Sequence, residues 1–426
     1  MSSIIYSMYP LVAERECQTL QAAGITTPLH LSYEIFKGIT NVRSAYQPDS
    51  LKTGETTVDF DDVRNRIAYL YMYAMAHTEI VENFFNSFYS NSIFFNDWLR
   101  NCNETLKICS IGGGPGSEIA GLILGLKDTL FRTTVHATII DRCEGWKNLF
   151  EYLLSLLETY KLVQKIERLR LICENMFQHH WNEEVIEEIS KANIITMMKF
   201  ISAIVWNEKL CRRALRQIFK TMKPGSLLLF IENAGGRSYQ VMDQEASKYG
   251  LLQVIEPILH YQYKSSNLYL TSFFLLLKKH MNMNPLKTTK LSIAVWQKKP
   301  LNYSLQDMQI DIRHYQLANL QLSFLGNIMT FEDTEEEISK RKTRKCSSMI
   351  PNYEYEYGRN FQPSRPQTAS LAPAQSTSIP TAHYSHSVNT ISSLPRRPQT
   401  ANLAPTQSTN IRTTHHSRLL SYCTII

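Results

Sequence analysis

The sequence lacks the features that mark several classes of protein. Its eight cysteines include no CxxC pair and several fall in predicted strands, which argues for reduced thiols rather than a disulfide framework. No apolar run is long enough to cross a membrane, and the N-terminus lacks the basic-then-apolar layout of a signal peptide. The histidines and acids lack a metal-ligand spacing. We therefore expect an intracellular protein, cytoplasmic or nuclear, with no membrane segment and no metal site.

Positive charge is concentrated at the end of the chain. The 426 residues carry a formal net charge of +7, and the hydrophobic share of 43% is enough for a substantial core. From Ser339 onward there are 11 Lys or Arg and only two acids, so the rest of the chain is close to neutral. The excess begins in the basic cluster 340–345. Such a cluster is typical of a nuclear-import signal or a nucleic-acid contact, although most charge runs are simply solvated faces.

Residues 333–426 have the composition of a disordered tail. They are rich in Ser, Thr, Pro, Gln and Asn and poor in residues that pack a core. Residues 365–373 recur with one substitution at 397–405, but two copies are too few to stack as a solenoid. Either duplication in an unconstrained tail or a paired docking motif explains the repeat. The tail is therefore a candidate contact for a protein or a nucleic acid.

The glycine-rich turn at residues 112–116 is the most informative feature of the chain. It follows an apolar run that predicts a strand and precedes a run that predicts a helix. A ligand can approach the main chain closely only where side chains are absent and N–H groups point outward. Gly121 and Gly125 lie four residues apart on one face of that helix, which predicts close packing of the helix against a sheet.

Predicted strands and helices alternate after this turn. The β-branched run 135–141 ends in Asp141, at the spacing expected of a βαβ nucleotide-binding unit. Asp141 either accepts hydrogen bonds from both hydroxyls of a ribose or merely starts a turn, and the order of the elements favours the ribose. Further strands are predicted at 169–173, 194–198 and 227–232, with helices at 146–160 and 181–191. This alternation predicts a parallel sheet with helices on both faces.

Two apolar runs after the fifth strand predict a β-hairpin. Residues 252–263 and 268–278 are β-rich and are joined by the polar residues 264–267. The second run would then be an antiparallel last strand. Residues 290–296 and 308–312 predict two extra strands, which would form a small annex to the sheet.

The combination of IGGGPGS at 111–117, an acid that closes the second strand and MKPGSLLLFIE at 222–232 resembles the class I S-adenosylmethionine-dependent methyltransferases. The resemblance covers about residues 105–278. It implies an α/β fold with a seven-stranded, mostly parallel sheet, an antiparallel last strand and helices on both faces. We expect four parts: an N-terminal helical cover (1–104), a Rossmann-like cofactor-binding domain (105–280), a small β-rich annex (281–332) and the disordered basic tail (333–426).

The resemblance also implies a cofactor, S-adenosylmethionine, and the residues that hold it. The glycines would line its methionine moiety and Asp141 would hold its ribose. Asn175 and Met176 would contact the adenine ring, with Glu174 as a competing candidate, while Lys199 and Phe200 would lie where the family positions its substrate. The expected cofactor-binding residues are Ile111, Gly112, Gly113, Gly114, Gly116, Asp141, Arg142, Asn175, Met176 and Lys199.

The sequence departs from the family pattern at one position. The first strand of the family commonly carries an acid two residues before the first glycine, where this chain has Ser110. Glu118 either supplies that charge from the start of the helix or only complements the helix dipole. No catalytic residue is legible, because a sulfonium already activates its methyl group and transfer depends mainly on positioning. His77, which shares a helix face with Tyr73, is a candidate base, although such residues are more often packed in a core.

The sequence therefore predicts a methyltransferase that acts on an unidentified protein, RNA or small molecule. The fourth strand lacks the Asn/Asp-Pro-Pro-aromatic and Pro-Cys motifs of nucleic-acid amine and cytosine C5 methylation, which disfavours both reactions. Two alternatives stay open. One is a non-catalytic scaffold that binds a partner through the basic tail, and the other is a nicotinamide-dependent oxidoreductase.

Overall fold

The computed structural model describes residues 3–47, 50, 53, 58–102, 104–130, 133–235, 237–265, 272–281 and 284–300. The predicted strand at 308–312, the basic cluster and the tail with its repeat lie outside these residues. Within the described part, no helix is both long enough and apolar enough to cross a membrane.

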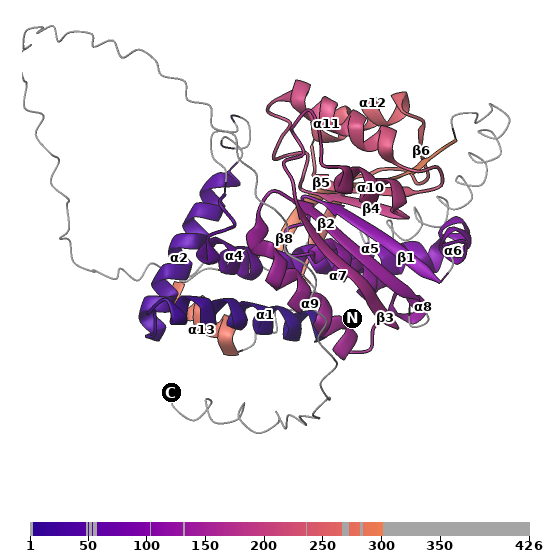
Figure 1. The fold of residues 1–426 in the computed structure, drawn as a ribbon. Helices are drawn as coiled ribbons and strands as arrows, with labels where there is room; N and C mark the ends of the chain where they lie inside the picture. The colour runs from indigo at the N-terminus through magenta and orange to yellow at the C-terminus, as the bar shows by residue number, and fades with distance from the viewer. Residues whose placement is uncertain are drawn as a thin grey trace, which may run out of the picture. The chain divides into compact units, whose positions relative to one another are not determined.

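A mixed β-sheet lies at the centre of the fold (Figure 1). Strands β1, β2, β3, β4 and β5 pair in parallel, and β8 is antiparallel to β5. Strands β6 and β7 pair with successive parts of the other edge of β8, so the eight strands occupy seven positions. The predicted fold class is confirmed. In spatial order the strands are β3 (Lys165–Cys173), β2 (Thr134–Asp141), β1 (Thr105–Ile111), β4 (Ile194–Met198), β5 (Leu227–Asn233), β8 (Thr288–Lys298) and β6 (Leu251–Gln253), with β7 (Ile258–Lys264) also beside β8.

The antiparallel strand comes from a different segment than the sequence pattern predicted. The first run of the expected hairpin forms β6 and β7, but the described residues of the second run belong to helix α13 (Ser272–Met281). The strand beside β5 is β8, from the segment assigned to the annex, and it pairs from Leu227 with Gln297 to Asn233 with Leu291. The hairpin prediction is wrong because a short, continuous apolar run has no period that distinguishes a strand from a buried helix.

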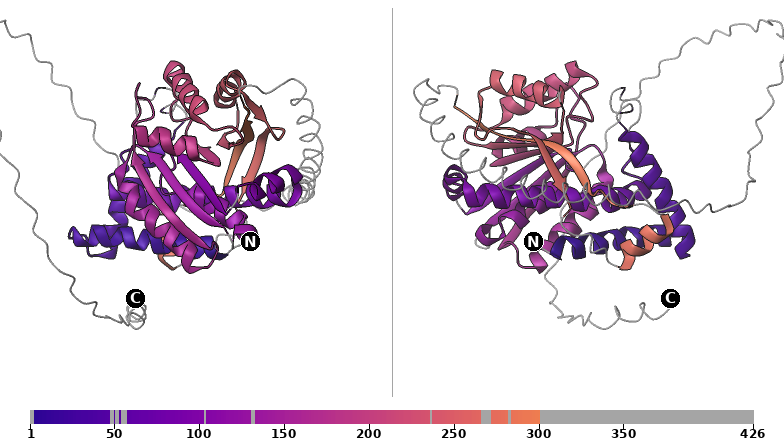
Figure 2. Two further views of the ribbon diagram at one scale, coloured as in Figure 1. Left: turned by 45° about the vertical axis from the view of Figure 1, so that its right-hand side comes forward. Right: turned by 180° about the vertical axis from the view of Figure 1, so that it is seen from behind.

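Helices cover both faces of the sheet, as Figure 2 shows. Neighbouring residues of one strand point to opposite faces, so Ile139 packs in the core beneath α7 and α9 while Ile140 packs in the core beneath α10 and α11. Helices α5, α7 and α9 lie on the first face and α10, α11 and α12 on the second (Figure 1). Their bounds are α5 (Met75–Asn91), α7 (Ser117–Gly125), α9 (Lys147–Thr159), α10 (Glu183–Lys191), α11 (Glu208–Thr221) and α12 (Arg237–Lys248).

The described residues before the sheet are largely helical, as predicted. One helical segment runs through α4, η1 and α5, and the Asp62 carboxylate caps its start by accepting from the Arg64 N–H. The middle of this segment, Leu70–Ala74, is a π-helical turn, a local widening that often accompanies functional sites. The remaining helical elements are α1 (Ser3–Ala22), α2 (Pro28–Ala45), α4 (Val63–Tyr69), α6 (Ile93–Arg100), α8 (Lys127–Leu130) and the short 3-10 helix η2 (Glu144–Trp146).

Gly121 and Gly125 bring α7 against helix α5, not against the sheet. A Cβ atom at Gly121 would lie 2.5 Å from the Thr78 carbonyl oxygen and 2.7 Å from the Val81 Cβ. A Cβ atom at Gly125 would lie 2.7 Å from the Glu82 carbonyl oxygen. The predicted close packing is present, but its partner is the helix of the N-terminal part. The two glycines therefore join that part to the helix that follows the glycine turn.

A buried carboxylate joins α11 to α12. Glu245 is fully buried and accepts hydrogen bonds from Arg212, Arg216 and Lys248 at 2.8, 2.9 and 3.1 Å. Burial by itself raises the pKa of this carboxyl, but the three cations overcome that effect and lower the pKa to about 2. We expect Glu245→Gln to reduce the free energy of unfolding at pH 7 by about 2 kcal/mol, because charge-assisted hydrogen bonds are lost.

The effect of Glu245→Gln should depend on pH. The folded-state pKa lies below the unfolded value, so the carboxylate stabilises the fold above pH 4.5 and this contribution disappears as the pH falls toward 2. Urea denaturation of both proteins at pH 7 and pH 3 measures this, and the difference between them should shrink at pH 3. An equal difference at both pH values would contradict the prediction.

Candidate functional site

The glycine turn between β1 and α7 has three residues in the left-handed region. Gly112, Gly114 and Gly116 have φ values of 67°, 49° and 86°. A Cβ atom at Gly112 would lie 2.7 Å from the Phe200 ring, and one at Gly116 would lie 2.5 Å from the Phe150 ring, so both sides of the turn are tightly packed. At Gly114 the nearest atom would be 3.6 Å away, in the Trp146 ring. Gly114 is thus the least crowded of the three glycines, and it is buried against the Trp146 ring.

Asp141 lies directly against this turn. Its Oδ2 accepts a hydrogen bond from the Gly114 N–H at 3.1 Å, and its Oδ1 accepts from the Cys143 N–H at 3.0 Å. Burial raises the pKa of this carboxyl despite these hydrogen bonds. The two elements that the sequence singled out therefore meet at the carboxyl edge of the parallel strands. That Asp141 binds a ribose stays a prediction.

The other expected residues lie at the carboxyl ends of the neighbouring strands. Asn175 follows β3 and accepts from the Phe177 N–H through Oδ1 at 3.1 Å, while the Met176 side chain is buried. Glu174 accepts from the Asn182 N–H at 3.1 Å and so stabilises the same loop. The Arg142 guanidinium donates to the Val58 carbonyl oxygen at 2.8 Å. Its side chain therefore contacts the N-terminal part of the chain.

The side chains of Ile111 and Ser110 are buried around the turn. Ile111 packs in the core on the α10 side of the sheet, so only its main chain can take part in a site. A Cβ atom at Gly113 would lie 2.4 Å from the Ser110 Oγ, which makes glycine necessary there too. The Ser110 Oγ is buried and has no hydrogen-bond partner. A buried hydroxyl without a partner next to the glycine turn is a polar atom that a bound ligand could satisfy.

Lys199 directly follows β4 and has a left-handed backbone, at a φ of 57°. Its Nζ donates to the Asn233 Oδ1 at the end of β5, and its main-chain N–H donates to the Ile231 carbonyl oxygen at 2.9 Å. Burial lowers the pKa of the Lys199 ammonium to about 8. This side chain can therefore be neutral or charged close to neutral pH.

His77 is a weaker base than the sequence suggested. It is buried, its Nδ1 is 3.0 Å from the Tyr69 hydroxyl oxygen, and its ring stacks on that of Tyr73. Burial, with a contribution from the charge of Lys199, lowers the pKa of His77 to about 3. The imidazole is therefore neutral near pH 7 and has little tendency to take up a proton. The effect of the Lys199 charge on this pKa indicates that α5 lies near the end of β4.

An aromatic cluster next to the turn was not predicted as part of the site. The Trp146 ring is the nearest group to Gly114, and it contacts Phe60 and Tyr69 at centroid distances of 4.8 and 5.6 Å. Burial raises the pKa of Tyr69 well above its usual value, so its hydroxyl stays neutral. The sequence assigned Trp146 to the predicted helix 146–160, whereas the residue ends the 3-10 helix η2 directly before α9. Periodicity cannot show that its ring reaches the glycine turn.

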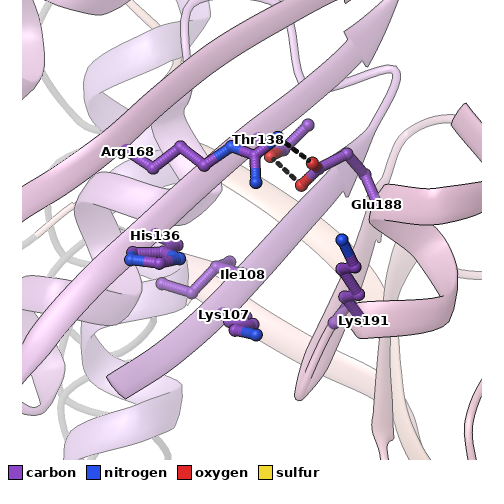
Figure 3. A pocket seen from close by; sticks show the side chains of 8 residues that line it. Lys107, Ile108, His136, Thr138, Arg168, Glu188 and Lys191 are labelled. Atoms are coloured by element: carbon purple, nitrogen blue, oxygen red, sulfur yellow. Dashed lines mark hydrogen bonds and ion pairs between the residues drawn. The ribbon is translucent and has the colours of Figure 1, made fainter. Parts of the chain in front are cut away.

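A separate hollow lies near the opposite ends of the strands, and Figure 3 shows its lining. The Glu188 carboxylate accepts from the Thr138 hydroxyl and from Arg168, each at 2.8 Å, so its charge is compensated. Among the residues that the structure describes, no group of three or more His, Cys, Asp or Glu could hold a metal ion. None of the expected site residues lines the hollow, whose lining consists of Lys107, Ile108, His136, Thr138, Arg168, Glu188, Lys191 and Ala192.

Comparison with known proteins gives a match to one family and to many solved structures. A family model described as "putative SAM-dependent methyltransferase" matches residues 59–273, which is half of the chain. No curated protein matches the sequence. Among the solved structures, a putative class I S-adenosylmethionine-dependent methyltransferase from Listeria monocytogenes is 11% identical, with a TM-score of 0.37 over 71% of this chain and 90% of that one.

Two further structures show the same kind of likeness. A SAM-dependent methyltransferase from Methanosarcina mazei is 13% identical, with a TM-score of 0.31 over 49% of this chain and 97% of that one. The N-methyltransferase NodS from Bradyrhizobium japonicum is 11% identical, with a TM-score of 0.28 over 48% of this chain and 94% of that one. The family match, which begins just before α4, is the informative result.

Proposed function

Because the chain belongs to the family of putative S-adenosylmethionine-dependent methyltransferases, we propose that it transfers the methyl group of S-adenosylmethionine to an acceptor bound beside Lys199. The observation that carries the proposal is the hydrogen bond between the Gly114 N–H and the Asp141 carboxylate at the carboxyl edge of the parallel strands. Ligands of open α/β sheets bind at this edge.

The residues at this edge fit the cofactor. Gly114 is the least crowded glycine of the turn, and the Ser110 hydroxyl lacks a partner. The glycines would contact the methionine moiety, Asp141 would hold the ribose hydroxyls, and Asn175 with Met176 would contact the adenine. When bound, S-adenosylmethionine supplies a methyl group that its sulfonium already activates. The protein then has to position the acceptor and exclude water.

Lys199 and its neighbours are suited to position an acceptor. The Nζ of Lys199 is held by Asn233, and its pKa of about 8 lets it either donate a hydrogen bond or hold a proton that an acceptor releases. His77, with a pKa of about 3, would act as a neutral hydrogen-bonding group rather than as the base. Tyr69 and Tyr73 flank it and would keep water away from the reacting atoms.

Binding of S-adenosylhomocysteine, measured by isothermal calorimetry, tests the cofactor site. We expect Asp141→Ala to weaken this binding about 10- to 100-fold, because a buried carboxylate that accepts two hydrogen bonds from a ligand is lost. Asp97→Ala, which removes an exposed acid on α6, should leave the affinity unchanged. Absence of binding to the folded wild-type protein would remove the proposal, and binding of NADH in its place would favour an oxidoreductase.

A non-catalytic scaffold is the second candidate function. The low pKa of His77 and the serine at position 110 favour it, because neither supplies the charge expected in an active site. Incubation with a cell extract and labelled S-adenosylmethionine separates the two candidates. Labelled product that depends on Lys199 supports transfer, whereas cofactor binding without any labelled product supports the scaffold.

A further inference from the structure

Glu118 is a buried acid beside the glycine turn. It lies in the first turn of α7, two residues after Gly116, and only 4% of its surface is exposed. Its carboxyl accepts from its own main-chain N–H and lies beside the Ser110 hydroxyl, which has no hydrogen bond of good geometry. The same hydroxyl is next to Gly113. The carboxyl of Glu118 is therefore close to the inner side of the turn.

Unlike four of the other buried glutamates, Glu118 forms no ion pair with a described residue. Glu16 pairs with Arg66, Glu34 with Arg64, Glu188 with Arg168 and Glu245 with Arg212. Among the described residues, no Lys, Arg or His forms an ion pair with Glu118. A buried carboxylate without a compensating cation is costly, and such groups usually become neutral or bind a positive ligand. The site therefore has a place for one positive group.

We propose that Glu118 binds the α-ammonium group of S-adenosylmethionine, in place of an acid at position 110. This inference rests on the proposed function. The ammonium has three N–H donors, which suit a carboxylate and the neighbouring Ser110 hydroxyl, whereas the sulfonium has none. The glycine turn, whose main chain would contact the methionine moiety, brings the amino-acid end of the cofactor to α7. Asp141 would then bind the ribose and Glu118 would bind the amino group.

The groups around Glu118 support a pH-dependent interaction. Tyr9 faces it from α1, Tyr69 from α4 and Asp141 from β2, and all of these are neutral or negative. Burial, with a contribution from the charge of Asp141, raises the pKa of Glu118 to about 8. Tyr9, with a pKa of about 12, and His77, with a pKa of about 3, do not titrate nearby, but Lys199 does. The variant Glu118→Gln, which keeps Lys199, isolates the contribution of the acid.

Two ligands that differ in the amino-acid end test the proposal. S-adenosylhomocysteine has the ammonium, and 5′-methylthioadenosine retains the adenosine and thioether but lacks the ammonium and its carboxylate. By calorimetry at pH 8.5, Glu118→Gln should weaken S-adenosylhomocysteine about 10- to 30-fold and change 5′-methylthioadenosine less than about 3-fold. Glu167→Gln, at a half-exposed acid on β3, is the matched control and should change neither affinity.

The pH dependence of the wild-type protein gives a second test that needs no variant. As pH rises from 6 to 8, S-adenosylhomocysteine should bind up to about tenfold more tightly per pH unit, because the carboxyl must lose its proton to receive the ammonium. 5′-Methylthioadenosine should not show this slope. Equal effects of Glu118→Gln on both ligands, or equal slopes, would overturn the proposal. If neither ligand binds the wild-type protein, the proposed function fails instead.

Discussion

Gly114→Arg should abolish binding of S-adenosylhomocysteine, with a loss of at least about 100-fold, and leave the protein folded. A Cβ atom at this glycine would meet only the Trp146 ring, at 3.6 Å, so the arginine side chain would pass beside that ring and fill the part of the turn that we propose for the cofactor. Because the wild-type φ is 49°, the substitution also strains the backbone by about 1 kcal/mol. Calorimetry measures the affinity, and circular dichroism measures the fold.

Gly250→Arg is the matched control for this prediction. Gly250 has a φ of 70° with nothing near its Cβ position, so it carries the same backbone strain at a site remote from the turn. It should bind S-adenosylhomocysteine as the wild type does. A Gly114→Arg protein that still binds the ligand normally would show that the glycine turn does not hold the cofactor.

Gly121→Leu should destabilise the protein by at least about 3 kcal/mol. Even a Cβ atom there would meet a backbone oxygen of α5 at 2.5 Å, and backbone of a packed helix cannot move aside as a flexible side chain can. The higher helix propensity of leucine raises the free energy of unfolding by only about 1 kcal/mol. Urea denaturation followed by circular dichroism gives the free energy of unfolding for both proteins.

Gly24→Leu provides the comparison for Gly121→Leu. Gly24 has a φ of 92° and nothing within contact distance, so only backbone strain of about 1 to 2 kcal/mol is expected there. If the two variants lost the same stability, the close approach of α5 and α7 would not matter to the fold. If Gly121→Leu loses clearly more stability than Gly24→Leu, the difference comes from the contact between α5 and α7.

The sequence predicted the parts of the fold that depend on local chemistry. The glycine turn, the acid at the end of β2 and the alternation of strands and helices are each specified by residues close together in the chain. Asp141 and Gly114 could be expected to meet because parallel strands end at a common edge. The segment 268–278 was assigned to a strand although its described residues form part of α13, because its apolar side chains suit a helix and a strand equally well.

The walls of the site depend on contacts between distant segments, and these were not predictable. Trp146 lies on the apolar side of a predicted helix, but its position over Gly114 results from the packing of three separate elements. In the same way, the absence of a side chain at Gly121 indicates a close contact with another element. The sequence does not say whether that element is a sheet or a helix. Glu118 was recognised, while its lack of a cation became visible only in three dimensions.

Helix α5 contacts both the surroundings of Lys199 and the start of α7. One of its residues, His77, is close enough to Lys199, at the proposed acceptor position, for the lysine charge to lower its pKa. The neighbouring Thr78 hydroxyl forms a hydrogen bond with the Tyr9 hydroxyl at 2.5 Å and donates to the Ser117 carbonyl oxygen at 3.1 Å. Since α7 begins at Ser117, any shift of α5 also displaces the start of that helix. If the proposed function holds, acceptor selectivity and cofactor affinity both depend on the position of α5, and substitutions in α5 that favour a new acceptor would also weaken cofactor binding.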